Sequence, residues 1–314
     1  MQSSSKKIAL YASYQTGEDL PGYVRFALKH LAETDFHIVL LTNERPLSEA
    51  TYEFLSENRI ELFLTRNHGF DFGMYRRYLQ LQANSASPIN GSITSGIDTY
   101  NIERLLLLND SIVYYQNRFT EFFAEAEKNP ADAVSLTCSN EFSPHLQTYF
   151  LYMKQPALGA FYLHLFETPE QDTPQNLAYN IQYPLSDIFM DAGIHMGSIF
   201  QTEKTASFAY PELIKDGAGF VKRKLLLGSF THKEKIRFLQ NDEYDSLNAD
   251  YASLVKSAGT AADFDDTWLD CPVKFKFKHY VDILWENAYR KVALPTTLAF
   301  LKIKKKWINK TTSK

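Results

Sequence analysis

The sequence predicts an α/β fold, in which a central, mostly parallel sheet is flanked by helices and followed by a helical C-terminal extension. Short apolar runs alternate with amphipathic runs from Ile8 to Leu64, in the order strand, helix, strand, helix, strand. The uninterrupted run Leu105–Leu108 is typical of a strand that is buried on both faces. Because consecutive parallel strands need a crossover between them, usually a helix, this order favours a parallel sheet.

The remaining elements are predicted one by one from the same two periodicities. The predicted strands are Ile8–Tyr14, His37–Leu41, Ile60–Leu64, Leu105–Leu108, Ala133–Thr137 and His145–Met153. The predicted helices are Pro21–Leu31, Ser48–Asn58, Met74–Gln82 and Phe119–Lys128, with Phe161–Gly193 helical but interrupted at Pro169, Pro174 and Pro184. Residues 84–101 are rich in Ser, Gly and Asn and predict a surface loop, and regularity fades beyond Asp242.

Composition excludes several classes of protein. A chain of 314 residues, 45% of them hydrophobic, buries a large core, and we expect a main domain over 1–230 and an extension over 231–314. Its 33 basic and 37 acidic residues provide no positive field for nucleic acid. The two cysteines, Cys138 and Cys271, are too few for a disulfide framework, which suits a cytoplasmic protein. No apolar window approaches the ~20 residues of a membrane span.

A glycine-rich turn follows the third predicted strand, in the stretch RNHGFDFGMYRRYLQL. One interpretation is structural: Gly69 and Gly73 let the chain turn into the next helix, and Asp71 caps that helix. The other is a binding turn, because a strand, a glycine-rich turn and a helix direct backbone N–H groups toward an anion such as a nucleotide diphosphate. The spacing matches neither the dinucleotide fingerprint nor a Walker loop.

The buried leucine strand ends in Asn109-Asp110-Ser111. A carboxylate at the end of a central strand reaches the cleft beyond the sheet, where it can hold a ribose or a hard cation such as Mg²⁺ or Mn²⁺. All three side chains offer oxygen, but only Asp110 is anionic. The alternative is a turn or helix cap, since Asn, Asp and Ser all cap well.

Taken together, these motifs resemble a known family. A nucleotide-compatible first strand, then R-N-x-G-x-D-x-G, then an apolar strand ending in N-D-S, resembles the GT-A fold of nucleotide-sugar glycosyltransferases. The set RNHGFDFGMYR, LLLLNDSIVYY, HLQTYFLYM and GFVKRKLL is similar to the rhamnan synthesis protein F family of bacterial polysaccharide glycosyltransferases. The resemblance implies transfer of a deoxyhexose, typically rhamnose from a dTDP donor, onto a polysaccharide or lipopolysaccharide acceptor at the inner face of the cytoplasmic membrane.

The resemblance also implies roles for individual residues. The donor nucleotide is expected to meet Tyr11, Ser13, Arg66, Asn67, Gly69, Asp71, Asn109 and Asp110, and a divalent cation to meet Asp110 and Ser111. N-D-S departs from the family's D-x-D because it offers one carboxylate instead of two. Metal binding is then weak, or a basic residue neutralises the diphosphate, with Lys222 and Arg223 as candidates.

An inverting transfer needs a general base near the acceptor hydroxyl. Glu141 and Asp187 are nearly equal candidates, with Asp191 behind them, and each also reads as an ordinary surface carboxylate. His145, Gln147 and Tyr149 are expected on one face of a strand, because alternate residues point the same way, and they line the acceptor site if that face is the cleft.

Two alternatives to an enzyme stay open. A non-catalytic member would bind a nucleotide sugar or glycan without turnover, which the single carboxylate of N-D-S permits. A structural partner in a polysaccharide assembly complex would use the basic tail FLKIKKKWINKTTSK as an anchor. That tail is either a solvated charge run or a peripheral contact with an anionic membrane.

Overall fold

The computed structural model describes residues 6–86, 102–139, 144–202, 205–207 and 209–223. The predicted surface loop lies largely outside these residues, and the C-terminal extension and the basic tail lie entirely outside them. No helix in the described part of the chain is long and apolar enough to cross a membrane.

A mostly parallel sheet of eight strands forms the centre of the fold, as the sequence predicts. The spatial order is β3-β2-β1-β4-β8-β6-β7, and β9 pairs with β6. The pairs β1–β2, β2–β3, β1–β4 and β6–β9 are parallel, whereas β8 runs antiparallel to both β4 and β6. The strands are β1 Lys6–Ser13, β2 His37–Asn43, β3 Glu61–Thr65, β4 Ile102–Asn109, β6 Ala133–Ser139, β7 His145–Leu146, β8 Phe150–Lys154 and β9 Met196–Phe200.

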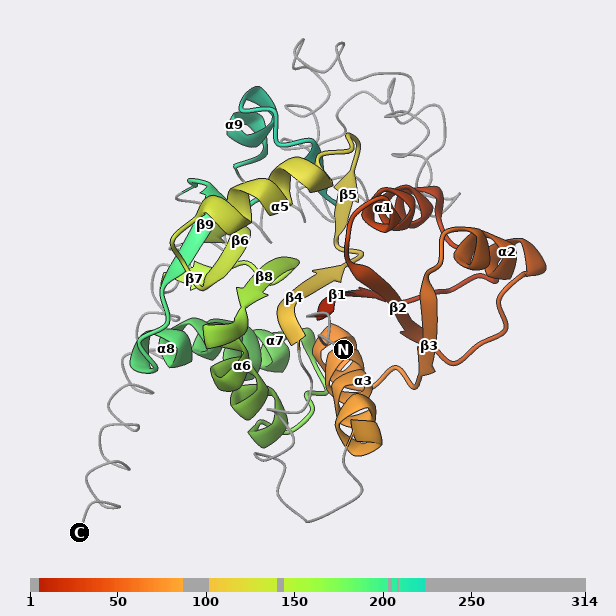
Figure 1. Cartoon of the computed structure of the whole chain (residues 1–314), viewed down its shortest axis with the longest axis horizontal. Helices are drawn as coiled ribbons and strands as arrows, with labels where there is room; N and C mark the ends of the chain where they lie inside the picture. The colour runs from red at the N-terminus through yellow and green to blue at the C-terminus, as the bar shows by residue number, and fades with distance from the viewer. Residues whose placement is uncertain (1–5, 87–101, 140–143, 203–204, 208, 224–314) are drawn as a thin grey trace, which may run out of the picture.

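Helices cover both faces of this sheet (Figure 1). On one face lie α1 Gly22–Ala32, α2 Glu49–Glu57 and α5 Phe119–Lys128, and on the other lie α3 Phe70–Ala86, α6 Gln155–Glu167 and α8 Tyr183–Asp191. The short helices α7 Pro174–Leu177 and η2 Ala178–Gln182 connect α6 to α8, and α9 Tyr210–Lys215 follows β9. Because successive side chains of a strand point to opposite faces, the odd-numbered residues of β1 belong to the apolar cluster on one face of the sheet and the even-numbered residues to the cluster on the other.

Strand order reverses beside β1. The chain moves from β1 outward to β2 and β3, and then returns across the sheet to place β4 on the other side of β1. Tyr11 is paired with Leu108 and Ala12 with Asn109, so the two strands end level with each other. Because ligands of open α/β sheets bind beyond the carboxyl ends of strands at such a switch point, this edge is where a site is expected.

Most predicted elements are confirmed, with small shifts at their ends. Ser48 caps α2 by accepting a hydrogen bond from the Thr51 N–H at 3.2 Å. Pro174 is the first residue of α7 and Pro184 the second residue of α8, where a missing N–H is tolerated because the first helical turn has no partner for it.

The prediction that the helix after the glycine-rich turn begins at Met74 is wrong, because α3 begins at Phe70. Gly69 has φ +72° and supplies the turn. Gly73 already lies in the helix, and a Cβ there would stand 2.1 Å from the His68 carbonyl oxygen. The second glycine therefore serves the close approach of the turn to the helix.

Two further differences concern strands. The predicted single strand His145–Met153 is divided into β7 and β8 by residues 147–149. The sequence reading also missed a two-stranded sheet, in which β10 Phe220–Lys222 pairs antiparallel with β5 Ile112–Tyr114. This small sheet brings Lys222 beside the end of β4, since Lys222 is paired with Ile112.

Candidate functional site

A cavity of about 520 Å³ lies beyond the carboxyl ends of β1 and β4, at the switch point of the sheet. Its lining comes from three parts of the chain. Strand ends and the turn before α3 contribute Ala12, Ser13, Tyr14, Asn67, Phe70, Asp71, Met74, Asn109, Asp110 and Ser111. The segment 145–149 contributes all of its residues, and the later elements add Leu177, Gln182, Tyr183, Thr205, Ser207 and Lys222.

Asp71 and Asn109 join the glycine-rich turn to the end of β4. Asn109 Nδ2 donates to Asp71 Oδ2 at 2.8 Å, and the Phe72 N–H donates to Asp71 Oδ1 at 3.0 Å. Asn109 Oδ1 accepts from the Ser111 N–H at 3.1 Å and from Ser111 Oγ at 2.5 Å. The two sequence motifs are therefore directly bonded, and Asp71 both accepts a hydrogen bond in the first turn of α3 and lines the cavity.

Asp110 is held at the end of β1. Its N–H donates to the Ala12 carbonyl oxygen at 3.1 Å, which extends the parallel ladder by one residue. Ser13 Oγ donates to Asp110 Oδ2 at 3.0 Å and accepts from Gln15 Nε2 at 2.6 Å. The guanidinium of Arg223 lies 3.9 Å from the same Oδ2 atom.

Both carboxyl groups are held in an environment that disfavours their charge. Burial raises the pKa of Asp71, although the Asn109 amide and the Phe72 N–H act in the opposite direction. Burial also raises the pKa of Asp110, opposed first by Arg223 and then by the Ser13 hydrogen bond, while the neighbouring Asp71 raises it further. Two carboxyl groups with raised pKa that face one cavity are typical of a functional site.

Lys222 brings positive charge to the same place. Its ammonium donates to Ser111 Oγ at 3.1 Å and lies 4.0 Å from the centre of the Tyr149 ring, a cation–π contact. The pairing of β10 with β5 fixes this position. Lys222 also lowers the pKa of Asp71, so its charge acts on the glycine-rich turn as well as on Ser111.

The side chains around Asp110 do not fit a resident divalent cation. Ser111 Oγ already accepts from an ammonium group, and Asp110 Oδ2 already accepts from Ser13 beside a guanidinium. Within the described ranges, no three His, Cys, Asp or Glu side chains gather around a common point. A hard cation needs several oxygen ligands without competing positive charge, so we derive no step through a metal and assign Asp110 and Ser111 no metal role.

Residues 145–149, just before β8, form the far wall of the cavity. His145, Gln147 and Tyr149 all line the cavity, and Leu146 and Thr148 between them line it as well. Residues 147–149 are not part of a regular strand, so odd-numbered and even-numbered side chains do not point to opposite faces. His145 packs edge-to-face on Tyr183 with ring centres 4.7 Å apart, and the Tyr149 hydroxyl is 2.6 Å from Thr137 Oγ1.

Several residues predicted for the site lie elsewhere. Tyr11 is fully buried in the apolar cluster on the α1 face, because an inward position on β1 leads to the core. Arg66 has an exposed side chain and does not line the cavity, and Gly69 acts only through its backbone turn. Asp187 is exposed on α8, outside the lining, as is Asp191, while Glu141 lies outside the described residues.

Sequence reasoning missed the part of the lining that follows β8. Leu177, Gln182 and Tyr183 come from the α7–η2–α8 connection, and Thr205 and Ser207 come from the segment after β9. None of them belongs to a recognisable motif. Leu177, Gln182 and Tyr183 stand at the ends of short helical elements, and Thr205 and Ser207 lie between β9 and α9, so nothing local in the sequence marks them.

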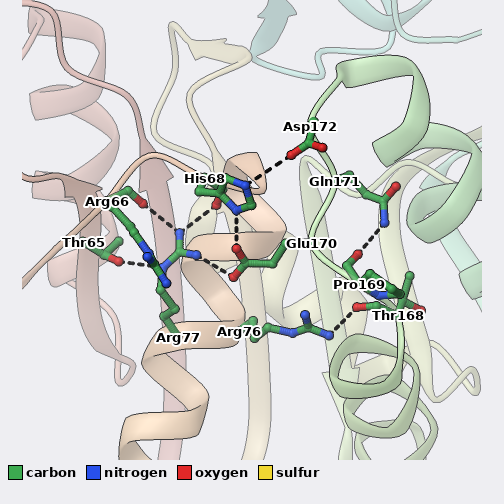
Figure 2. A network of polar contacts seen from close by, with 10 residues as sticks. All are labelled: Thr65, Arg66, His68, Arg76, Arg77, Thr168, Pro169, Glu170, Gln171 and Asp172. Carbon is green, nitrogen blue, oxygen red and sulfur yellow. Dashed lines mark hydrogen bonds and ion pairs between the residues drawn. The ribbon is translucent and has the colours of Figure 1, made fainter.

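A separate ionic cluster holds the glycine-rich turn in place (Figure 2). Arg77 Nε donates to Thr65 Oγ1 at 2.7 Å, one terminal nitrogen donates to Glu170 Oε1 at 2.6 Å, and the other donates at 2.8 Å to the carbonyl oxygens of Arg66 and His68. His68 lies between Glu170 and Asp172, as Figure 2 shows. We call Arg77, His68, Glu170 and Asp172 the Arg77 clamp.

The clamp ties the turn to the connection that leads into α7. The adjacent Arg76 donates to the carbonyl oxygens of Leu165 and Thr168 at the end of α6. These contacts join the turn that carries Asp71 to the chain that leads into the α7–η2–α8 connection. Both segments line the cavity, so the contacts hold two parts of its wall together.

No protein-family model matches the sequence, and no curated protein matches it significantly. Solved structures with some similarity include a cytidylyltransferase from Leptospira borgpetersenii serovar Hardjo-bovis, with 13% identity, 79% of this chain and 96% of that chain covered, and a TM-score of 0.39. A 4-diphosphocytidyl-2C-methyl-D-erythritol synthase from Anaerococcus prevotii has 10% identity over 63% and 88% of the two chains, with a TM-score of 0.40.

A glycosyltransferase involved in the glycosylation of the major capsid of PBCV-1 is also similar, with 14% identity, 68% of this chain and 94% of that chain covered, and a TM-score of 0.34. We base the function proposed for this chain on the cavity itself and on the sequence motifs.

Proposed function

We propose that this chain is a glycosyltransferase that moves a deoxyhexose, rhamnose from dTDP-rhamnose, onto a cell-surface polysaccharide or lipopolysaccharide acceptor. One observation carries the proposal. The two motifs behind the family resemblance meet in a single cavity at the switch point of the sheet, through the 2.8 Å bond between Asn109 and Asp71. A nucleotide is the ligand class that open α/β sheets bind at this place.

The nucleotide end of the cavity is assigned to the strand ends and the turn. The Asp71 carboxylate accepts a hydrogen bond from a sugar hydroxyl of the nucleotide, with Asn67, Asn109 and Ser13 around it. A carboxylate often binds a sugar hydroxyl of the nucleotide in α/β sheets, and the deoxyribose of dTDP offers its 3′-hydroxyl for this contact. Asp110 borders the same end and holds Ser13 in position.

The diphosphate is assigned to Lys222 and Arg223. When the glycosidic bond breaks, negative charge grows on the departing diphosphate, and a fixed positive group nearby stabilises it most in the transition state. Lys222 is already anchored by Ser111 and Tyr149, so little side-chain freedom is lost when an anion binds. Arg223 adds a second positive charge from its place beside Asp110, although it is not among the residues that line the cavity.

The acceptor is assigned to the opposite wall, with His145, Gln147 and Tyr149. The acceptor hydroxyl must lose a proton as it attacks the anomeric carbon. Of the two bases predicted from sequence, Glu141 keeps the role, because it lies four residues before the cavity-lining His145, whereas the Asp187 side chain is exposed outside the lining. Membrane contact through the basic tail completes the proposal and places the reaction at the inner face of the cytoplasmic membrane.

Binding and turnover of the donor test this function. We expect calorimetry to show that dTDP and dTDP-rhamnose bind whether Mn²⁺ or EDTA is present, and a glycan acceptor to be rhamnosylated in both buffers. Lys222→Met should weaken dTDP binding about tenfold, the effect of losing one charge-assisted contact. Lys215→Met, on the exposed face of α9, is the matched control and should bind as the wild type does.

Each other outcome identifies a different error. Absence of nucleotide binding would refute the proposed function, and binding that requires Mn²⁺ would refute the assignment of the diphosphate to Lys222. Tight donor binding without transfer to any acceptor would favour the non-catalytic alternative.

A further inference from the structure

Three polar side chains on one part of the cavity wall have no hydrogen-bond partner for an atom that is fully buried. The atoms are Gln147 Nε2, Thr205 Oγ1 and Ser207 Oγ, and the absence of partners holds among the described residues. All three residues line the cavity. Buried polar groups are nearly always hydrogen-bonded, because leaving them unpaired costs free energy. A cluster of exceptions at one cavity therefore calls for an explanation.

The three groups are fixed to one another. The Ala206 N–H, between Thr205 and Ser207 in the chain, donates to Gln147 Oε1 at 3.5 Å. The Gln147 N–H donates to the Thr137 carbonyl oxygen at 3.1 Å, which fixes the backbone of that residue to β6. With its oxygen held by Ala206, the Gln147 amide must direct its NH₂ group elsewhere, and its side chain is too buried, at 8% exposure for the residue, to reach bulk water.

Other unpaired hydroxyls do not behave in the same way. Those of Tyr11 and Tyr114 also lack a partner among the described residues, but both rings are fully buried in the apolar core and neither lines the cavity. In the part of the chain that the structure describes, only the Gln147, Thr205 and Ser207 groups combine burial, a lack of partners and a place on the cavity wall. This combination points to a ligand that supplies the missing partners.

The chemistry of the three groups defines that ligand. One is a neutral amide donor and two are hydroxyls that both donate and accept, and none of the three is charged. They complement the hydroxyl groups of a neutral sugar, which also donate and accept. The same cavity is lined by the edge-to-face pair of His145 and Tyr183 and by Leu177, which offer apolar surface to the C–H face of a sugar ring.

We propose that Gln147, Thr205 and Ser207 form a subsite for the hydroxyl groups of an uncharged sugar unit, separate from the charged nucleotide end at Asp71, Asp110 and Lys222. The subsite rests on the proposed function for its neighbour in the cavity, the nucleotide diphosphate. Beyond the proposed function, the subsite specifies which residues recognise the sugar and that the sugar is uncharged. The sugar is either the one carried by the donor or a unit of the acceptor.

Near-isosteric substitutions test the subsite: Gln147→Met, Thr205→Val and Ser207→Ala. For each variant we expect unchanged affinity for dTDP and about tenfold weaker binding of the sugar, the loss of one or two neutral hydrogen bonds. Loss of dTDP-rhamnose binding assigns the subsite to the donor sugar. Loss of binding to methyl glycosides of rhamnose, glucose, galactose or mannose, measured by saturation-transfer NMR, assigns it to the acceptor.

A second readout is independent of any ligand. Thr205→Val removes a buried hydroxyl that has no partner, so the melting temperature should stay the same or rise. Thr51→Val is the matched control, because Thr51 is also buried but its hydroxyl bonds to the Glu18 carbonyl oxygen and the Leu20 N–H, and it should lower the melting temperature.

Several results would overturn the subsite. These are equal losses for dTDP and dTDP-rhamnose, wild-type sugar affinity in all three variants, tighter binding of a glucuronate than of the neutral glycosides, or a Thr205→Val variant destabilised as much as Thr51→Val. If no nucleotide binds the wild type while the glycosides do bind and the variants lose them, the proposed function fails and the subsite stands.

Discussion

The Arg77 clamp and the cavity wall both contain buried polar side chains, but these side chains are satisfied by protein partners to very different degrees. In the clamp, every donor nitrogen of the Arg77 guanidinium has a protein acceptor, and the side chains of Arg77 and Glu170 are only 14% and 19% exposed. On the cavity wall, an amide nitrogen and two hydroxyls are buried without a partner among the described residues, and two carboxyl groups have raised pKa.

The difference separates polar groups that stabilise the fold from polar groups that await a ligand. A satisfied network lowers the free energy of the folded chain and is costly to interrupt. An unsatisfied polar group raises that free energy, and such groups are retained in proteins where ligand binding or catalysis requires them. Substitution in the clamp should therefore change stability first, and substitution at the cavity should change ligand binding first.

Arg77→Ala should have the largest effect on stability. It leaves Glu170, Thr65 and two backbone carbonyl groups without their donor, and we expect a loss of about 3 kcal/mol in the free energy of unfolding, measured by urea denaturation. Arg66→Ala is the matched control, because its side chain is exposed, and it should change stability by less than about 0.5 kcal/mol. A loss below about 1 kcal/mol for Arg77→Ala would show that the clamp is not structural.

Asp71→Ala should weaken donor binding far more than folding. The carboxylate's bond from Asn109 is lost, but so is the cost of a buried charge, and the two changes oppose each other. We expect dTDP-rhamnose affinity to fall about 30-fold, the worth of one charge-assisted hydrogen bond, and the free energy of unfolding to change by less than about 1 kcal/mol.

Asp35→Ala is the matched control for that experiment. Asp35 is a surface carboxylate paired with Lys7 away from the cavity, and its removal should leave binding unchanged. If Asp71→Ala loses stability and affinity to the same degree, Asp71 is a helix-turn residue only, and the structural interpretation of the glycine-rich turn is correct.

The sheet could be predicted from the sequence because buried strands and helices have apolar residues in characteristic patterns along the chain. A central strand such as β4 is apolar at Leu105–Leu108 since both faces are covered, and β1 to β3 alternate with helices whose apolar spacing is plain. The meeting of Asp71 with Asn109 could also be expected, because both follow parallel strands that end at the same edge.

The rest of the site depends on contacts between residues far apart in sequence. Nothing local in TASF marks Thr205 and Ser207, whose significance comes from their place beside Gln147, a residue far away in the sequence. Lys222 was a candidate only through resemblance, and its place depends on a strand pairing with Ile112 that short strands seldom reveal. Asp187 is the opposite case. Its sequence context made it a candidate base, but its side chain is exposed on α8.

Asp110→Asn should produce the smallest change, and its sign is the sharpest test of the comparison. Burial raises the pKa of Asp110 in the folded chain above the value of about 3.9 that an unfolded Asp has. The folded state then binds this proton more tightly, so wild-type stability falls as pH rises from the unfolded pKa to the folded pKa. Asn cannot ionise, and it also removes the repulsion that Asp110 and Asp71 exert on each other.

The Asp110→Asn chain should therefore gain stability relative to wild type over the range above about pH 4, compared with the difference between the two proteins at lower pH. Melting temperatures recorded across that range give the measurement. A gain in stability together with lost turnover is the behaviour of a group retained for binding or catalysis. A constant difference at every pH would mean that the wild-type carboxylate is no harder to ionise when folded, and Asp110 would then belong with the satisfied groups of the clamp.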